Sequence, residues 1–171
     1  MTWEFLATSF IVVLLPGTGV IYTLAIGLGR GFLPSVIAAF GCTLGIVPHL
    51  IASIIGLAAL LHASAVAFQI IKYLGVLYLL YMAWSILRDG GALDVAARKD
   101  RVPAWRLIRD GIALNVLNPK LSIFFLAFLP QFVSPNASYP TWEMGMLASV
   151  FMAMTFAVFF IHVTTTGRDM T

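Results

Sequence analysis

The sequence predicts an all-α, polytopic membrane protein with about five transmembrane helices in a single membrane domain, residues 1–171. Hydrophobic residues make up 61% of the chain and charged residues only 10%, whereas roughly 25% of a soluble domain is charged. A helix needs about 20 apolar residues to cross a bilayer core, and the chain contains several such runs. The runs are continuous and do not alternate as the strands of a membrane barrel would, so we expect helices.

The expected helices cover residues 3–28, 32–61, 65–87, 107–133 and 143–163. The first has no preceding Lys or Arg and no Ala-x-Ala cleavage pattern, so we expect it to stay in the membrane rather than to be removed as a signal peptide. The fourth is apolar apart from Arg109, Asp110 and Lys120. Residues 88–106 contain the only strongly polar stretch and are expected to form a cytoplasmic linker.

The basic residues indicate how the helices are oriented. Six of them lie in or beside the linker, namely Arg88, Arg98, Lys99, Arg101, Arg106 and Arg109. Arg30 and Arg168 flank alternate helix ends, so the positive-inside rule places all of these in the cytoplasm of a bacterial inner membrane. Lys72, at the outer start of the third helix, is the one exception. Because the net charge of +3 is spread between helices, the indicated partner is the lipid bilayer and not nucleic acid.

The sequence contains no recognisable enzyme motif. There is no Ser-His-Asp set, metal-ligand cluster or phosphate loop, and a single cysteine, Cys42, excludes a disulfide framework. We therefore expect neither an enzyme nor a protein that holds a cofactor or metal.

Two of the expected helices are interrupted inside the membrane. The first is broken at Pro16, Gly17, Thr18 and Gly19, and the fourth at Asn118 and Pro119. Each break lies about 13 residues from the end at which its helix enters the membrane, or about 20 Å, so the breaks reach similar depths from opposite faces. A repeat of three helices would then be inverted across the membrane, as in many secondary transporters.

The broken segments supply the candidate site residues. Pro16 removes a backbone donor, and the exposed carbonyls are tolerated in hydrocarbon only where protein, water or a ligand satisfies them. Pro16, Gly17 and Thr18 are therefore expected to border a cavity; a kink repaired by a neighbouring helix is the alternative.

Asn118 suits a helix N-cap and Pro119 the first helical position, so a half-helix can begin there. Lys120 follows directly, and burying a cation costs at least about 2.5 to 3.5 kcal/mol on insertion scales, so we expect it to face protein or water. These features would attract a carboxylate, such as that of an amino acid. The alternative is that Lys120 extends to the cytoplasmic surface and only anchors the helix.

The second expected helix carries small residues along one face, at Gly41, Gly45, Ala52 and Gly56. Small residues at this spacing allow close helix packing. His49 shares the face and is a candidate for substrate binding or proton relay, because its pKa is ordinarily near neutrality. A structural histidine is an equal alternative.

Taken in order, these motifs resemble those of the lysine exporter (LysE/RhtB-type) superfamily of amino-acid exporters. The matching elements are Pro16-Gly17, the Gly41 to His49 stripe, the run from Lys72 to Trp84, Asn118-Pro119-Lys120, and Phe124 to Phe132 with its Leu-Pro-Gln core. The resemblance implies efflux of amino acids or related metabolites by a secondary transporter, driven by the proton motive force and without a cofactor. It leaves a homo-oligomer open.

The sequence departs from this family in two respects. Thr18 stands where the family has the second proline of Pro-Gly-Pro, which restores a donor and adds a hydroxyl. The family also has about six hydrophobic segments, so the sixth helix of a three-plus-three inverted repeat is expected to be missing here. The alternative to an exporter is therefore a truncated, non-transporting membrane protein or a subunit that requires a partner.

Overall fold

The computed structural model describes residues 2–61, 102–134 and 137–168, together with positions 69, 70, 73, 74, 77, 80, 81 and 84. The third expected helix, residues 65–87, is described only at those scattered positions. Most of the expected linker, residues 88–101, lies outside the described residues, as does Lys72.

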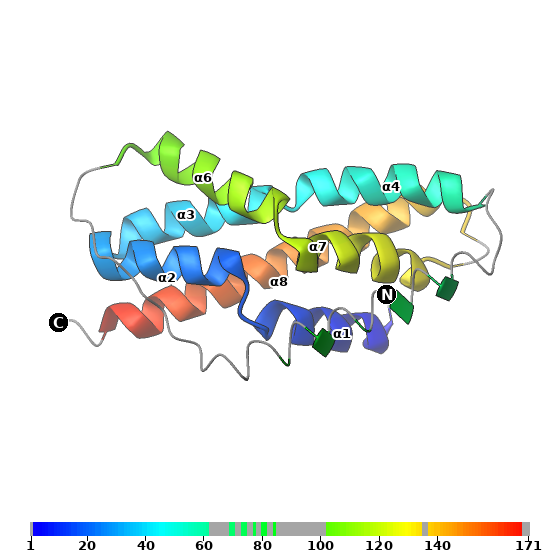
Figure 1. Cartoon of the computed structure of the whole chain (residues 1–171), viewed down its shortest axis with the longest axis horizontal. Coiled ribbons are helices and arrows are strands. Elements are labelled where there is room, and N and C mark those ends of the chain that lie inside the picture. Colours follow the sequence, from blue (N-terminus) through cyan, green and yellow to red (C-terminus); the bar gives the residue numbers. More distant parts are fainter. Residues whose placement is uncertain are drawn as a thin grey trace.

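The described chain is all-helical, which confirms the predicted fold class. The elements are α1 (Trp3–Leu14), α2 (Thr18–Arg30), α3 (Phe32–Leu44), α4 (Val47–Leu61), α6 (Ala104–Val116), α7 (Pro119–Ile123), the π-helical turn η1 (Phe124–Phe128), the 3₁₀ turn η2 (Leu129–Phe132) and α8 (Pro140–Arg168). They lie roughly side by side along one long axis, with α8 running most of its length (Figure 1).

Several segments of the described part are long and apolar enough to cross a membrane. Phe32–Gly56 and Pro140–Thr164 qualify as single helices of 25 residues each. Two further pairs qualify if each is one bent span: α1 with α2, bent by 50°, and Ala104–Val116 with Pro119–Phe132, bent by 55°. The predicted interruptions of the first and fourth helices are thus present as real bends.

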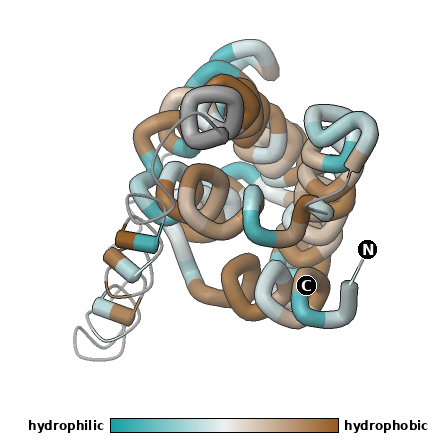
Figure 2. The backbone as a smooth tube through the Cα atoms, turned by 90° about the vertical axis from the view of Figure 1, so that its right-hand side faces the viewer, coloured by the Kyte–Doolittle hydropathy of each residue, from teal (hydrophilic) through white to brown (hydrophobic). Residues whose placement is uncertain are grey.

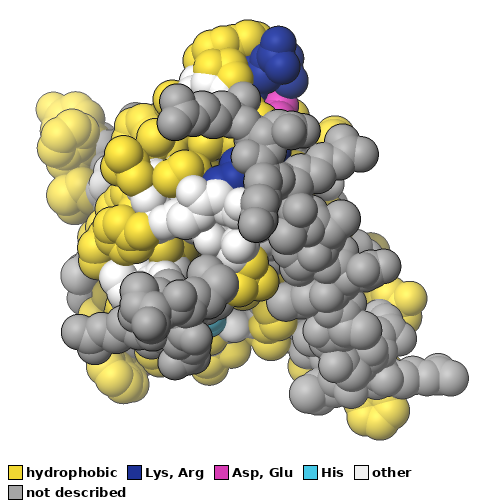
Figure 3. Space-filling view, turned by 90° about the vertical axis from the view of Figure 1, so that its left-hand side faces the viewer, with side chains coloured by type: hydrophobic (Ala, Val, Ile, Leu, Met, Phe, Trp, Pro, Cys, Tyr) yellow, Lys and Arg dark blue, Asp and Glu magenta, His cyan; other side chains and the backbone are white. Residues whose placement is uncertain are grey.

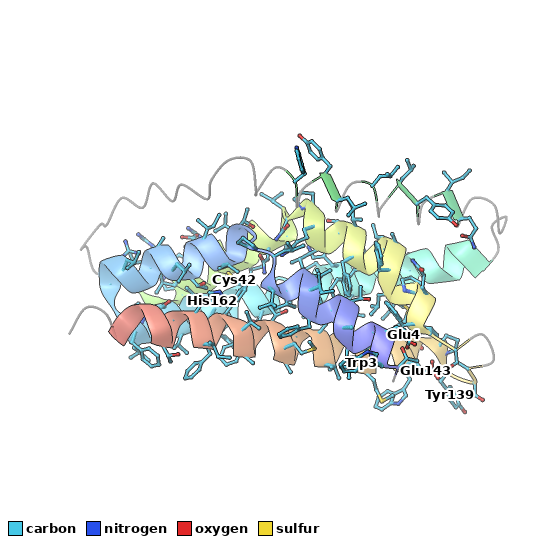
Figure 4. All side chains as sticks on the ribbon, turned by 90° about the horizontal axis from the view of Figure 1, so that it is seen from below. Trp3, Glu4, Cys42, Tyr139, Glu143 and His162 are labelled. Carbon is cyan, nitrogen blue, oxygen red and sulfur yellow. The ribbon has the colours of Figure 1, made fainter. Side chains whose placement is uncertain are left out.

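The two ends of the bundle differ in charge. The C-terminal end of α2 with Arg30, the start of α6 with Arg106 and Arg109, and the end of α8 gather at one end (Figures 1 and 3). Glu4 and Glu143 lie at the opposite end, close to Trp3 and Tyr139 (Figure 4). This distribution agrees with an orientation in which the basic end faces the cytoplasm.

The sides of the bundle carry large apolar side chains that a water-soluble protein would bury. They are spread over several helices, and hydrophobic residues recur around the bundle in Figure 2; examples are Phe10, Ile21, Leu33, Phe40, Ile55 and Ile161. Extensive apolar exposure of this kind marks contact with lipid or another protein.

Aromatic packing holds α8 against the segment that follows the second break. The ring of Phe124 stacks on that of Phe151 with centroids 4.6 Å apart, and Phe125 meets Phe151 edge-on at 5.4 Å. All three side chains are fully or almost fully buried. The π-helical turn redirects carbonyls in this segment, and the Ser53 hydroxyl from α4 donates to the carbonyl of Phe125.

Glycines bring α3 and α6 into backbone contact. A Cβ atom at Gly41 would lie 2.7 Å from the Cα and carbonyl oxygen of Ile108, and one at Gly111 would lie 2.8 Å from the backbone nitrogen of Cys42. Such contacts are the expected use of small residues between membrane helices.

The packing role predicted for Ala52 is wrong. Its side chain is exposed, and the neighbouring Ser53 is buried instead. Ser53 lies four residues after His49, so it continues the buried face that His49 belongs to, whereas Ala52 lies to one side of it. The element packed against this face is η1, where the hydroxyl of Ser53 donates to the carbonyl of Phe125.

Gly41→Ala should destabilise the protein by about 1–3 kcal/mol, because the added methyl group would overlap backbone atoms of α6. Thermal unfolding of the purified protein in detergent measures the change. The control is Gly145→Ala on α8, where a Cβ meets nothing within 4 Å and the higher helix propensity of alanine should leave stability equal or slightly greater. Equal losses in the two variants would contradict the close contact of α3 with α6.

Candidate functional site

The two helix breaks lie against each other in the middle of the bundle. A Cβ atom at Gly17, between α1 and α2, would lie 3.2 Å from Lys120 Nζ and 3.4 Å from Asn118 Nδ2, which belong to the break between α6 and α7. Figure 1 shows the two junctions close together. Residues roughly a hundred positions apart in the sequence therefore form one site.

Pro16 creates an orphan acceptor that Lys120 satisfies. In a continuous helix the carbonyl of Val12 would accept the N–H of residue 16, but proline has none. Lys120 Nζ donates instead to Val12 O at 3.0 Å and to Leu15 O at 2.7 Å. The lysine thus replaces backbone donors that the first break removes.

Pro119 likewise leaves a carbonyl without its backbone donor, that of Asn115, four residues before it. The carbonyl of Asn115 loses its regular donor and accepts from Asn118 N at 3.0 Å and from His49 Nε2 at 2.8 Å. Because a carbonyl can only accept, Nε2 carries the hydrogen in this bond. Nδ1 of the ring lies 3.3 Å from the hydroxyl of Ser122. His49 therefore repairs the second break as Lys120 repairs the first.

Asn118 caps the helix that begins after the second break. Its side-chain oxygen accepts from Lys120 N at 3.1 Å, and Pro119 occupies the first turn, as expected for these residue types. On the other break, the hydroxyl of Thr18 donates to Leu114 O at 3.5 Å. Both contacts help to position the two breaks, one within its own chain segment and one across to α6.

A pocket opens where the breaks meet. It is lined by Val12, Val13, Gly17, Gly19, Val20, Asn115, Asn118, Lys120, Leu121, Phe151, Thr155 and Phe159. The space that water could fill inside it is about 20 Å³ in this conformation, room for about one water molecule. The lining combines apolar walls with a few polar groups, which is the usual composition of a small-molecule site.

Lys120 places a positive charge in this pocket without a carboxylate beside it. Its side chain is only 6% exposed, and among the described residues no carboxylate forms an ion pair with it. Backbone carbonyls alone therefore compensate the ammonium group. A buried cation of this kind normally has a functional role in a membrane helix.

Of the residues predicted from the sequence, Gly17, Asn118 and Lys120 line the pocket. Pro16 and Pro119 lie at the breaks beside it, Thr18 contacts α6, and His49 adjoins it through Asn115. Sequence reasoning missed Asn115 and Thr155. The available signal for Asn115 was a polar residue in an apolar run, four positions before a proline.

Known proteins resemble this chain over most of its length. The model of the LysE type translocator family matches residues 10–169. The chain is 29% identical over 166 residues to the leucine efflux protein of Enterobacter sp. (strain 638), covering 92% of this chain and 77% of that protein. It is 33% identical to an uncharacterized membrane protein of Pseudomonas aeruginosa, covering 86% and 71%.

A homoserine/homoserine lactone efflux protein of Salmonella typhimurium is 32% identical, with 80% of this chain and 68% of that protein covered. No solved structure matches.

The contact between Lys120 and the first break can be tested by a double-mutant cycle. Lys120→Met removes the donor and should cost about 1–3 kcal/mol for each carbonyl left unsatisfied. Pro16→Ala supplies an N–H for Val12 O, so in that background the loss caused by Lys120→Met should shrink by at least about 0.5 kcal/mol. Thermal or denaturant unfolding in detergent measures all four proteins.

The matched control for this cycle is Pro34→Ala, because Pro34 lies in the first turn of α3 and not at either break. In that background the cost of Lys120→Met should be unchanged. If Pro16→Ala and Pro34→Ala gave the same cost, Lys120 would not be replacing the donor that Pro16 lacks.

Proposed function

Because the chain belongs to the LysE type translocator family, we propose that it exports amino acids or related small metabolites as a secondary transporter. The observation that carries this proposal is the pocket at which two proline-broken helices meet around a buried cation. The names of relatives, leucine efflux protein and homoserine/homoserine lactone efflux protein, support the substrate class.

In this proposal Lys120 binds the carboxylate of the substrate. An ammonium group has three donors, and two of them are used on Val12 and Leu15. A carboxylate would form a stronger, charge-assisted bond than the neutral carbonyls do. Gly17 leaves room for this contact, since a side chain there would meet Nζ.

Exchange of partners at Lys120 offers a way to couple binding to movement. When the ammonium group turns from the carbonyls of α1 to a substrate, the end of α1 loses the donors that tie it to α7. Broken helices of this kind commonly act as hinges around a central site in alternating-access transporters. The proposed site therefore comprises Pro16, Gly17, Thr18, His49, Asn118, Pro119 and Lys120.

We place the protein in the inner membrane as a multi-pass protein, with the basic end in the cytoplasm and the proton motive force as the driving force. His49 is the candidate proton carrier, because it is buried and bonded to the carbonyl of Asn115. Among the described residues that line the pocket, no carboxylate is present to take this role.

Cells that produce the protein should release amino acids faster than cells without it. We would load them with dipeptides, follow a panel of amino acids in the medium, and expect a protonophore to stop the release. Gly145→Ala should export at the original rate. Equal intracellular accumulation with and without the protein would count against export and favour the non-transporting alternative.

Lys120→Ala should reduce export at least tenfold (about 1.4 kcal/mol), since it removes a charge-assisted contact with the substrate. In a Pro16→Ala background, where Lys120→Ala costs less stability, it should still reduce export tenfold relative to Pro16→Ala alone, which separates the carboxylate contact from the structural one. Membrane-inserted protein is quantified in parallel. Normal export by a Lys120→Ala variant would exclude the carboxylate role.

A further inference from the structure

The buried amide of Asn115 has one atom without a partner. Its Nδ2 donates to the carbonyl of Cys42 at 2.6 Å, which fixes the orientation of the amide. The other atom, Oδ1, is fully buried and has no hydrogen-bond partner among the described residues. The whole side chain is only 2% exposed, and a buried acceptor left unpaired is rare in proteins.

This oxygen faces Gly19 in the pocket. A Cβ atom at Gly19 would lie 2.8 Å from Asn115 Oδ1, and both residues line the same pocket as Lys120. Oδ1 is covered in this conformation, and because residue 19 has no side chain, the oxygen packs directly against the backbone of this pocket-lining residue. Any side chain there would overlap it.

Thr155 adds a second acceptor to this part of the pocket. Its side chain is 4% exposed, and its hydroxyl donates to Phe151 O at 2.8 Å within α8. Because the hydroxyl hydrogen is used in that bond, the oxygen can only accept a further hydrogen bond. Asn115 and Thr155 therefore each offer an acceptor, which suits a ligand that donates hydrogen bonds.

We propose that Asn115 Oδ1 binds the protonated amino group of the substrate, so that Asn115 and Lys120 together select molecules carrying an ammonium group and a carboxylate. This inference rests on the proposed function and deepens it, because it assigns the residue that recognises the amino group of the substrate. Asn115 is then the residue that rejects simple carboxylic acids.

The spacing of the two groups suits such a ligand. Lys120 Nζ lies against Gly17 and Asn115 Oδ1 against Gly19, two residues further along the same break. An α-amino acid presents its carboxylate and ammonium group on one carbon and adds a hydrogen bond of about 2.9 Å at each. A small zwitterion therefore offers an acceptor to Lys120 and a donor to Asn115, and both residues line one pocket.

Calorimetric binding to the purified full chain tests the proposal directly. The probes are leucine and 4-methylpentanoate, which has the same carbon skeleton and carboxylate without the amino group. The original protein should bind leucine at least tenfold more tightly, because a site with a buried acceptor rejects a ligand that leaves it unpaired.

Gly19→Ala should bring this affinity ratio close to one, since its methyl group would overlap the position of Oδ1 and keep a ligand away from it. Asn115→Leu removes the acceptor itself and should have the same effect. Gly145→Ala is the control and should keep the original ratio. Because the ratio compares two ligands on one folded protein, an overall loss of stability does not produce the expected change.

A ratio near one in the original protein, no binding of either probe to it, or an unchanged ratio in both pocket variants would overturn the proposal. The export assay tests the proposed function separately. Selective binding of leucine without release of amino acids from cells would support the ammonium site and contradict the proposal of an exporter.

Discussion

The structure around the site depends on two carbonyl groups that have no backbone hydrogen-bond donor. Each arises because a proline occupies the position four residues later, Pro16 after Val12 and Pro119 after Asn115. Neither can be left unpaired at membrane depth without a cost of several kcal/mol. The chain meets this requirement with side chains from elsewhere, Lys120 at the first break and His49 at the second.

These bonds explain why a pocket lies between the breaks. Lys120 must reach from the start of α7 to the end of α1, so the two interrupted spans are held together at their weakest points. Gly17 and Gly19 keep side chains out of the space that remains. On one side the aromatic rings of Phe124 and Phe125 pack against Phe151 of α8. The polar lining of the pocket consists of two amides, the hydroxyl of Thr155 and the ammonium group of Lys120.

Much of this arrangement could be predicted from the sequence. Continuous apolar runs indicate membrane helices, and Pro, Gly and Asn have backbone preferences that locate breaks without tertiary information. A lysine directly after such a break was a reasonable site residue for the same reason. The family resemblance drawn from the ordered motifs is confirmed by the match over residues 10–169, while the roles of individual site residues stay predictions.

Other features depend on contacts that one sequence does not reveal. The partner of Lys120 is the carbonyl of a residue 108 positions away, and the unpaired oxygen of Asn115 is evident only when its other amide atom is seen to bond Cys42. Small size alone places Ala52 on the packed face in the sequence-based prediction. Ser53 is buried there instead, because its hydroxyl bonds the carbonyl of Phe125 in η1, a contact between residues 72 positions apart.

Solid-state NMR in lipid bilayers can measure the contact between the breaks. With Lys72 and Lys99 replaced by arginine, lysine is labelled with ¹⁵N at Nζ and valine with ¹³C at the carbonyl, and Val12→Ile identifies the signal of Val12. The hydrogen bond of 3.0 Å predicts a nitrogen-to-carbon distance of roughly 4 Å. Dipolar recoupling that placed Nζ more than about 6 Å from this carbon, beyond any hydrogen bond, would contradict the account.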